Sequence, residues 1–310
     1  MTNFPFRLDR LFDKLFSDSN IRFFQIGIVV IAILGLLTHV GLIYLSDLFN
    51  QEYHWMEVIG TNYLSAIYTP FSFILFYEVF LLVISIAEST TSFIGRQYQI
   101  ISLIVIRDTF KDISKFGGFE VSENNRQAFI DVLLDMGGGV ALFLMVTVFY
   151  HLRGTLKDQR IGGLSSKELK SFVSFKKHLA LVLSVVLFAL AAVSLGGWIQ
   201  DAAAVVWSGK TPSLDVDRIF YVDMFTIMIF SDVLILLTSM AFIREYRLVI
   251  RNAGFVISTI IIRFALSISK PYDVELAILG SVFGTLVLAV YSYSLRVSYK
   301  KGPNEFDEIA

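Results

Sequence analysis

The feature that most constrains this chain is a series of long apolar runs, each near the length at which a helix crosses a bilayer. A helix that spans the hydrocarbon core needs about 20 consecutive, mostly apolar residues. Hydrophobic residues make up 55% of the chain and charged residues only 17%, whereas an ordinary soluble domain carries about 25% charged residues. We therefore expect an all-α, polytopic protein that folds in lipid.

Eight segments are expected to span the membrane. In chain order they are Phe24–Leu45, Ala66–Ala87, Tyr98–Phe110, Phe129–Tyr150, Leu179–Ile199, Phe220–Phe242, Ala253–Ser269 and Val274–Tyr293. The third and seventh are the least apolar, because they carry Arg107 with Asp108 and Arg263. Eight crossings place most lysines and arginines on the cytoplasmic side, as the positive-inside rule requires. The expected location is a cell membrane, the bacterial inner membrane, with both termini in the cytoplasm.

The two halves of the sequence share short matches at corresponding places. The segment Phe76-Tyr77-Glu78-Val79 corresponds to Phe230-Ser231-Asp232-Val233, and Ile106-Arg107 corresponds to Ile262-Arg263. Each half has four expected crossings, an even number, so both halves enter the membrane from the same side. This internal repeat predicts two parallel four-helix units, residues 21–153 and 178–299, related by an axis along the membrane normal.

Three further segments are expected outside the repeats. Residues 1–20 carry apolar side chains at helical spacing with basic side chains between them. They predict an amphipathic cytoplasmic helix, lying on the membrane surface or packed on the protein's own cytoplasmic face. Residues 154–177 read as a basic cytoplasmic linker, which suits a cytoplasmic partner or anionic lipid. Residues 300–310 are polar and acidic, and we expect them to be disordered.

Each repeat is expected to hold an acid and an arginine near the middle of the bilayer. A rise of about 1.5 Å per residue places Glu78 and Arg107 about 15 and 16 Å from the inner edge, and Asp232 and Arg263 about 18 Å from it. We expect the ion pairs Glu78–Arg107 and Asp232–Arg263. Such residues are costly in lipid and are candidates for a transport site. They can equally be structural pairs that fix the register of adjacent helices.

Four acids are expected toward the outer surface. Asp131 and Asp273 begin the last helix of each repeat, where the helix dipole stabilises a negative charge, so capping accounts for them. Asp135 lies about one turn deeper than Asp131 on the same face, and Asp223 lies in the outer third of the sixth span. Together the four could line an outer vestibule that attracts cations.

Several classes of chemistry have no motif in the sequence. There is no cysteine, and the four histidines are scattered, so we expect no metal site. No phosphate-binding loop, dinucleotide fingerprint or nucleophile elbow is present, so we expect neither an enzyme nor a cofactor. A net charge of -1 gives no indication of nucleic-acid binding.

A family resemblance rests on four features of the segments Phe71–Ser114 and Phe225–Ser269. They are an acid in an aromatic-rich helix (Phe76-Tyr77-Glu78), an arginine starting the next helix (Arg96, Arg251), an Ile-Arg deeper in it (Ile106-Arg107, Ile262-Arg263), and Pro271-Tyr272-Asp273-Val274. These features resemble the phosphate-starvation-inducible PsiE family of small four-helix bacterial membrane proteins. The first half departs from the pattern, because no proline precedes Asp131 and the loop Asp112–Arg126 is longer. The second half has Asp232 where the family tends to have glutamate. The resemblance implies a tandem duplication of a family unit, and it supports the expected fold and location more than any mechanism.

Two functions are compatible with these patterns. The first is a membrane transport protein or channel for a small ion, with a pathway beside one or both ion pairs, in a homo-oligomer or between the repeats. The alternative is a non-transporting membrane scaffold or stress-response regulatory subunit, with the N-terminal helix and the basic linker as docking surfaces. Transport predicts a hydrated cavity that reaches Glu78 or Asp232, and a scaffold predicts dry, fully packed pairs.

Overall fold

The computed structural model describes residues 4–48, 63–67, 69–113, 126–155, 166–208, 216–242, 245–268, 270 and 272–301. These residues are almost entirely helical and include no strand. The helices are α1 (Phe4–Leu15), α2 (Asp18–Leu48), α4 (Tyr63–Ala66), α5 (Thr69–Ser85), α6 (Thr90–Ile113), α7 (Arg126–Gly154), α8 (Ser166–Ser208), α9 (Val216–Phe242), α10 (Tyr246–Ser267) and α11 (Tyr272–Lys301).

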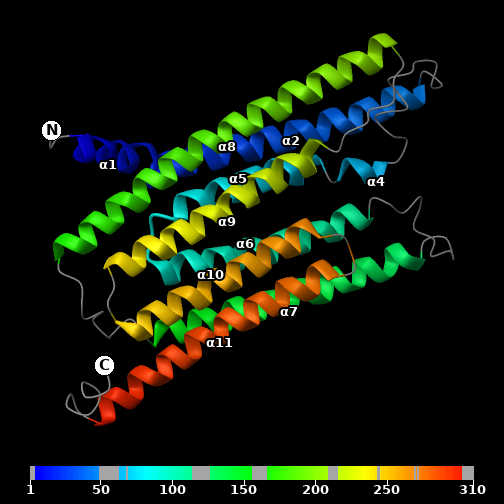
Figure 1. Cartoon of the computed structure of the whole chain (residues 1–310). Helices are drawn as coiled ribbons and strands as arrows, with labels where there is room; N and C mark the ends of the chain where they lie inside the picture. The colour runs from blue at the N-terminus through cyan, green and yellow to red at the C-terminus, as the bar shows by residue number, and fades with distance from the viewer. Residues whose placement is uncertain are drawn as a thin grey trace.

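The long helices form one bundle in which they run alternately in opposite directions (Figure 1). In the first half α2 packs on α5 and α6 packs along α7; in the second half α8 packs on α9 and α10 packs along α11. Contacts of α7 with α11, of α6 with α10 and of α5 with α8 join the halves. The end of the bundle that holds α1 and the end of α11 is called the inner end below, and the opposite end the outer end.

Six helices are long and apolar enough to cross a membrane. Their apolar spans are Asp18–Leu45, Phe129–Gly154, Lys170–Gly197, Val222–Ala241, Tyr246–Ser267 and Tyr272–Val297. The sequence predicted eight spans, so the prediction exceeds by two the number of helices that meet the criteria of length and apolar character; α5 and α6 do not meet them. Helix α5 is apolar but has only 17 residues, and polar and charged side chains interrupt the apolar run of α6. The seventh expected span, which carries Arg263, is among the six as α10.

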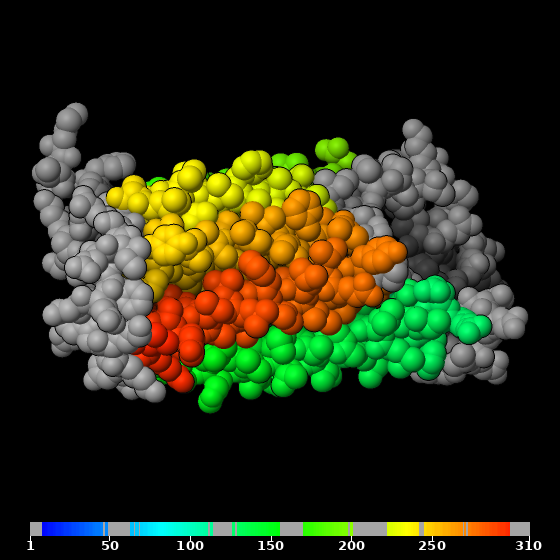
Figure 2. All heavy atoms as spheres, turned by 60° about the horizontal axis from the view of Figure 1, so that its bottom comes forward, coloured from blue at the N-terminus to red at the C-terminus, as the bar shows by residue number. Residues whose placement is uncertain are grey.

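Apolar side chains cover much of the outer surface of the bundle. Phe143, Val185, Phe230 and Val290 are exposed for 64%, 70%, 72% and 68% of their surface and come from four different helices. One face of the bundle consists of α9, α10, α11 and α7 lying side by side (Figure 2). Large contiguous apolar surfaces mark contact with lipid or with another protein. This exposed apolar surface and the six apolar helices are the features of a multi-pass membrane protein.

The segments outside the expected repeats have different limits from those predicted. Residues 1–20 do not form one helix, because α1 ends at Leu15 and α2 begins at Asp18. Helix α1 packs along α8, where Ser174 Oγ donates to Asp9 at 2.9 Å and Lys177 Nζ lies 2.7 Å from Asp13 Oδ1. Of the two interpretations of α1, these contacts favour packing on the protein's own inner end.

The expected linker also differs, since residues 166–177 are the beginning of α8 rather than a loop. Residues 156–165, the rest of that linker, lie outside the described residues. So do residues 302–310, which hold most of the tail that we expected to be disordered.

Candidate functional site

The buried charges of the second half form a closed ion pair. Asp232 comes from α9 and Arg263 from α10; Arg263 Nη1 lies 2.8 Å from Asp232 Oδ2, and the two side chains are 1% and 2% exposed. Thr259, one turn before Arg263, donates its hydroxyl to the same oxygen at 2.9 Å. Gln97 of α6 also lies beside Asp232. The predicted pair Asp232–Arg263 is therefore present, and it is sealed from solvent between the two halves.

The acid and the arginine predicted to pair in the first half, Glu78 and Arg107, do not form an ion pair with each other. Glu78 of α5 is only 8% exposed, and its Oε2 has no hydrogen-bond partner among the described residues. Arg107 of α6 is near enough to act on the charge of Glu78, but no ion pair joins these two described side chains. Arg107 Nη2 instead binds Asp108 Oδ1 at 3.1 Å. The structure thus brings Glu78 and Arg107 into the same region without forming the predicted pair.

A second charged cluster joins the two halves at the outer end. Lys270, between α10 and α11, donates to Asp135 Oδ2 of α7 at 2.6 Å and also to Asp112 Oδ2 of α6. Both carboxylates are 1% exposed. Partial burial alone would lower the pKa of Lys270, but its hydrogen bonds to Asp112 and Asp135 outweigh burial and raise the pKa. The lysine therefore stays charged, and its single positive charge is shared between two acids of the other half.

The four acids predicted to line an outer vestibule have different surroundings. Asp135 lies in the Lys270 cluster, and Asp273 is half-buried near Lys270. Asp131 accepts a hydrogen bond from Gln127 Nε2 at 3.1 Å, and Asp223 is exposed on α9. The contacts therefore connect two of the four with Lys270, and place the other two elsewhere on the surface.

Sequence reasoning did not identify Asp108, Asp112 and Lys270 as site residues. A signal existed for the acids, because Asp108 and Asp112 are four residues apart on α6, as Asp131 and Asp135 are on α7, and residues four apart share a helix face. Lys270 had no local signal, since it is 158 residues from Asp112 and 135 from Asp135.

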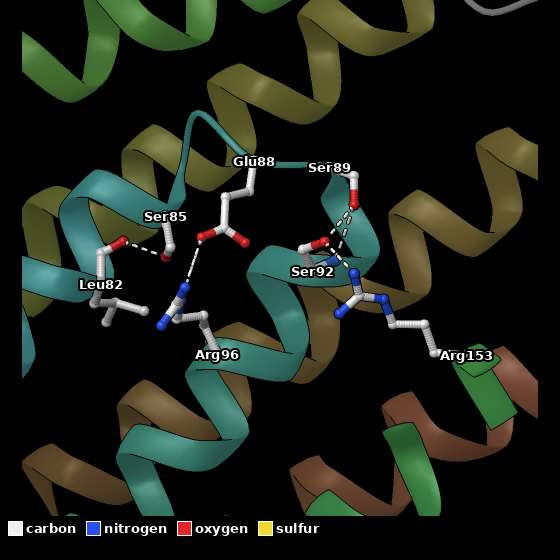
Figure 3. A network of polar contacts seen from close by, with 7 residues as sticks. All are labelled: Leu82, Ser85, Glu88, Ser89, Ser92, Arg96 and Arg153. Atoms are coloured by element: carbon white, nitrogen blue, oxygen red, sulfur yellow. Dashed lines mark hydrogen bonds and ion pairs between the residues drawn. The ribbon is translucent and has the colours of Figure 1, made fainter. Parts of the chain in front are cut away.

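A third charged cluster lies at the inner end of α6 and α7 (Figure 3). Arg96 donates through Nη2 and Nε to Glu88 Oε1, at 3.0 and 3.3 Å, and Arg153 Nη2 donates to Ser92 Oγ at 2.7 Å. Buried Lys176 of α8 donates to the main-chain oxygen of Glu88. A cleft of about 420 Å³ opens here; its lining residues are Glu88, Arg96, Gln99, Tyr150 and Arg153.

Between the inner and outer clusters, one aromatic side chain fixes the two halves together. Tyr98 of α6 is fully buried, and its hydroxyl lies 2.7 Å from Ser258 Oγ of α10. Ser258 in turn donates to the main-chain oxygen of Gly280 at 2.7 Å. A Cβ at Gly284 would come within 1.9 Å of the Tyr98 hydroxyl. The absence of a side chain at Gly284 therefore permits this contact.

No group of three or more His, Asp or Glu side chains among the described residues is arranged to hold a metal ion. Comparisons with protein-family models, with curated proteins and with solved structures found no match. The resemblance to the PsiE family and the tandem duplication therefore stay predictions from the sequence.

Proposed function

We propose that this chain is a membrane transport protein that conducts protons, with Glu78 as the proton-binding group in the first half. The observation that carries the proposal is the state of Glu78, which is buried and keeps Oε2 without a hydrogen-bond partner within the described part of the chain. An ionisable group deep in a membrane protein commonly marks an ion pathway or proton relay. A carboxylate without an ion pair of its own can gain or lose a proton without breaking a structural contact.

The surroundings of Glu78 favour a proton over a metal cation. Metal cations such as Ca²⁺ and Mg²⁺ are held by several oxygen ligands, and the described side chains include no suitable acidic group of three. The cleft at the inner end and an apolar pocket between α1, α2 and α8 are not lined by Glu78 or Asp232. A proton needs no open pore, because it can pass between neighbouring side chains and single water molecules.

A series of acids connects Glu78 with the outer end. Asp108 is near enough to act on the charges of both Glu78 and Asp135, and Asp112 shares Lys270 with Asp135. The proposed path therefore runs from the Lys270 cluster past Asp108 to Glu78. Arg107, beside both Asp108 and Glu78, would balance the charge when Glu78 loses its proton.

The same proposal includes eight membrane crossings in two parallel repeats, with both termini in the cytoplasm. Support comes from the position of α5 and α6, which pack against long apolar helices inside the bundle, and from the same order of packing in each half. Eight crossings also agree with the location of α1 and the end of α11 at the same end (Figure 1).

Proton flux into liposomes tests the proposal. The purified full chain is reconstituted with a pH-sensitive dye inside, and a potassium diffusion potential drives protons inward. We expect Glu78→Gln to reduce flux to the level of protein-free vesicles. The matched control is Asp131→Asn, which removes an acid of the same half that lies at the end of α7 and binds Gln127; its flux should be unchanged. Full flux in Glu78→Gln would contradict the proposal.

A non-transporting membrane scaffold or regulatory subunit is the second candidate. The specific observation in its favour is the closed Asp232–Arg263 pair, which has the dry packing expected of a structural pair. The same assay separates the two candidates, because wild-type chain that gives no more flux than empty vesicles supports the scaffold.

A further inference from the structure

The cleft at the inner end carries an excess of positive charge that the proposed proton path does not use. Arg96 reaches it from α6 and Arg153 from α7 (Figure 3). Buried Lys176 of α8 donates to the main-chain oxygen of Glu88. Glu88 is the one acid among the described lining residues. Two cations and one carboxylate therefore line the cleft, with a third cation buried beside Glu88, and the arrangement suits a second anion.

The two arginines are held in position and still have donors available. Arg96 uses Nε and Nη2 on Glu88, and Arg153 uses Nη2 on Ser92. A guanidinium group has five N–H donors, so these contacts occupy only part of each set. In Figure 3 the Glu88 carboxylate points at Arg96, in the position that an external anion would take.

We propose that this cleft binds the phosphate group of an anionic phospholipid, and that the Glu88 carboxylate is an internal occupant that the phosphate displaces from Arg96. A guanidinium group matches the geometry of phosphate oxygens and binds them through charge-assisted hydrogen bonds, and Arg96 and Arg153 both line this cleft. The hydroxyl of Tyr150 and the amide of Gln99 line the same cleft and add uncharged polar groups.

The surface next to the cleft indicates a lipid rather than a free phosphate. Gln99, Leu103 and Ile106 follow one another at helical spacing along α6. Leu103 and Ile106 are 50% and 40% exposed, so an apolar strip leads from the cleft toward the middle of the bundle. An acyl chain can lie along this strip while its phosphate contacts Arg96 and Arg153. A soluble phosphate would gain nothing from the strip.

Native mass spectrometry of the full chain, with phosphatidylglycerol or phosphatidylcholine added to detergent micelles, tests this site. We expect Arg96→Gln/Arg153→Gln to weaken retention of phosphatidylglycerol by about tenfold or more, since charge-assisted hydrogen bonds are lost. Glu88→Gln should strengthen it, because the competing charge is gone. The matched control is Lys14→Gln, an exposed cation of α1 at the same end, which should change nothing.

The opposite signs expected for the arginine and Glu88 variants keep the test decisive even if the double variant folds poorly. Equal retention of the two lipids, or no gain in Glu88→Gln with intact helical circular dichroism, would overturn the site. Displacement of phosphatidylglycerol by millimolar inorganic phosphate would show that the cleft binds free phosphate, and would contradict the proposal that its ligand is a phospholipid. None of these results depends on whether Glu78 conducts protons.

Discussion

The two acid–arginine pairs predicted from the sequence, one in each half of the bundle, are in different states. In the second half Arg263 lies 2.8 Å from Asp232, and both side chains are almost completely buried. In the first half Arg107 binds the adjacent Asp108, and no ion pair joins the described side chains of Arg107 and Glu78. One oxygen of each acid, Glu78 Oε2 and Asp232 Oδ1, has no hydrogen bond to any described residue, so the halves differ in the ion pair itself. Corresponding charges therefore do not by themselves determine whether an ion pair closes.

Neighbouring positions explain the difference. The residue after the arginine is Asp108 in the first half and Phe264 in the second, so only Arg107 has a competing carboxylate beside it. Four residues before the arginine, the second half has Thr259, whose hydroxyl donates to Asp232, where the first half has an apolar residue. The second half thus supplies an additional donor, Thr259, to its acid, and the first half supplies an additional acceptor, Asp108, to its arginine. This difference explains why the ion pair forms in the second half alone.

The largest expected effect comes from removing the acid of the closed pair. Asp232→Asn leaves the Arg263 charge buried without a counter-charge, so we expect the free energy of unfolding to fall by about 3–5 kcal/mol. Glu78→Gln should change it by less than about 1 kcal/mol, because no ion pair is lost. Thermal and denaturant unfolding in detergent measures both. An equal fall in the free energy of unfolding in Asp232→Asn and Glu78→Gln would contradict the difference between the two acids.

The next effect concerns the link between the halves at the outer end. Lys270→Gln removes the hydrogen bonds that the lysine donates to buried Asp112 and Asp135, and we expect the free energy of unfolding to fall by about 2 kcal/mol. Because the pKa of Lys270 is raised in the folded chain, this contribution is complete below the ordinary lysine pKa of about 10.4 and is lost as the pH rises above it. Unfolding measured from pH 7 to 11 checks this; a loss of the contribution already near pH 8 would contradict it.

An effect of similar size is expected where the halves touch at Tyr98. Gly284→Ala places a methyl group against the Tyr98 hydroxyl and Ser258, and overpacking of this kind costs about 1–3 kcal/mol. Gly137→Ala is the matched control on the last helix of the first half, where nothing lies within 4 Å of the added Cβ. Denaturant unfolding should give a lower free energy of unfolding for Gly284→Ala than for Gly137→Ala. Equal values would contradict a close contact between Gly284 and the Tyr98 hydroxyl.

The smallest change in stability should accompany the variant that makes the first half resemble the second. Asp108→Asn removes the carboxylate that competes for Arg107, so Arg107 should move toward Glu78. We expect a stability change within about 1 kcal/mol, as for a partly exposed pair, together with reduced proton flux. The liposome assay and unfolding are measured on the same preparation. Unchanged flux would contradict both the proposed path past Asp108 and a role of Arg107 in conduction.

The sequence predicted the helical class and one of the two pairs, and it failed where contacts are not local. Asp232 and Arg263 were found because apolar surroundings make single charges conspicuous. The Glu78–Arg107 pair was predicted on the same grounds and is not formed, because depth along a helix does not reveal that Asp108 competes. The bonds from Lys270 to Asp112 and Asp135 could not be found from helical spacing, since they arise only when the connection between α10 and α11 meets the distant helices α6 and α7.

The short length of α5 has a consequence for the distance between water and the buried acid. Glu78 lies nine residues after Thr69 and seven before Ser85, so it is about 14 and 11 Å along the axis from the ends of its helix. Asp232 is about 24 and 15 Å from the ends of α9. A bilayer adjusts to a short hydrophobic segment by becoming thinner around it. With α5 as one of the eight proposed crossings, we expect the hydrocarbon barrier to be narrowest beside Glu78, where headgroups and water from both leaflets would approach most closely.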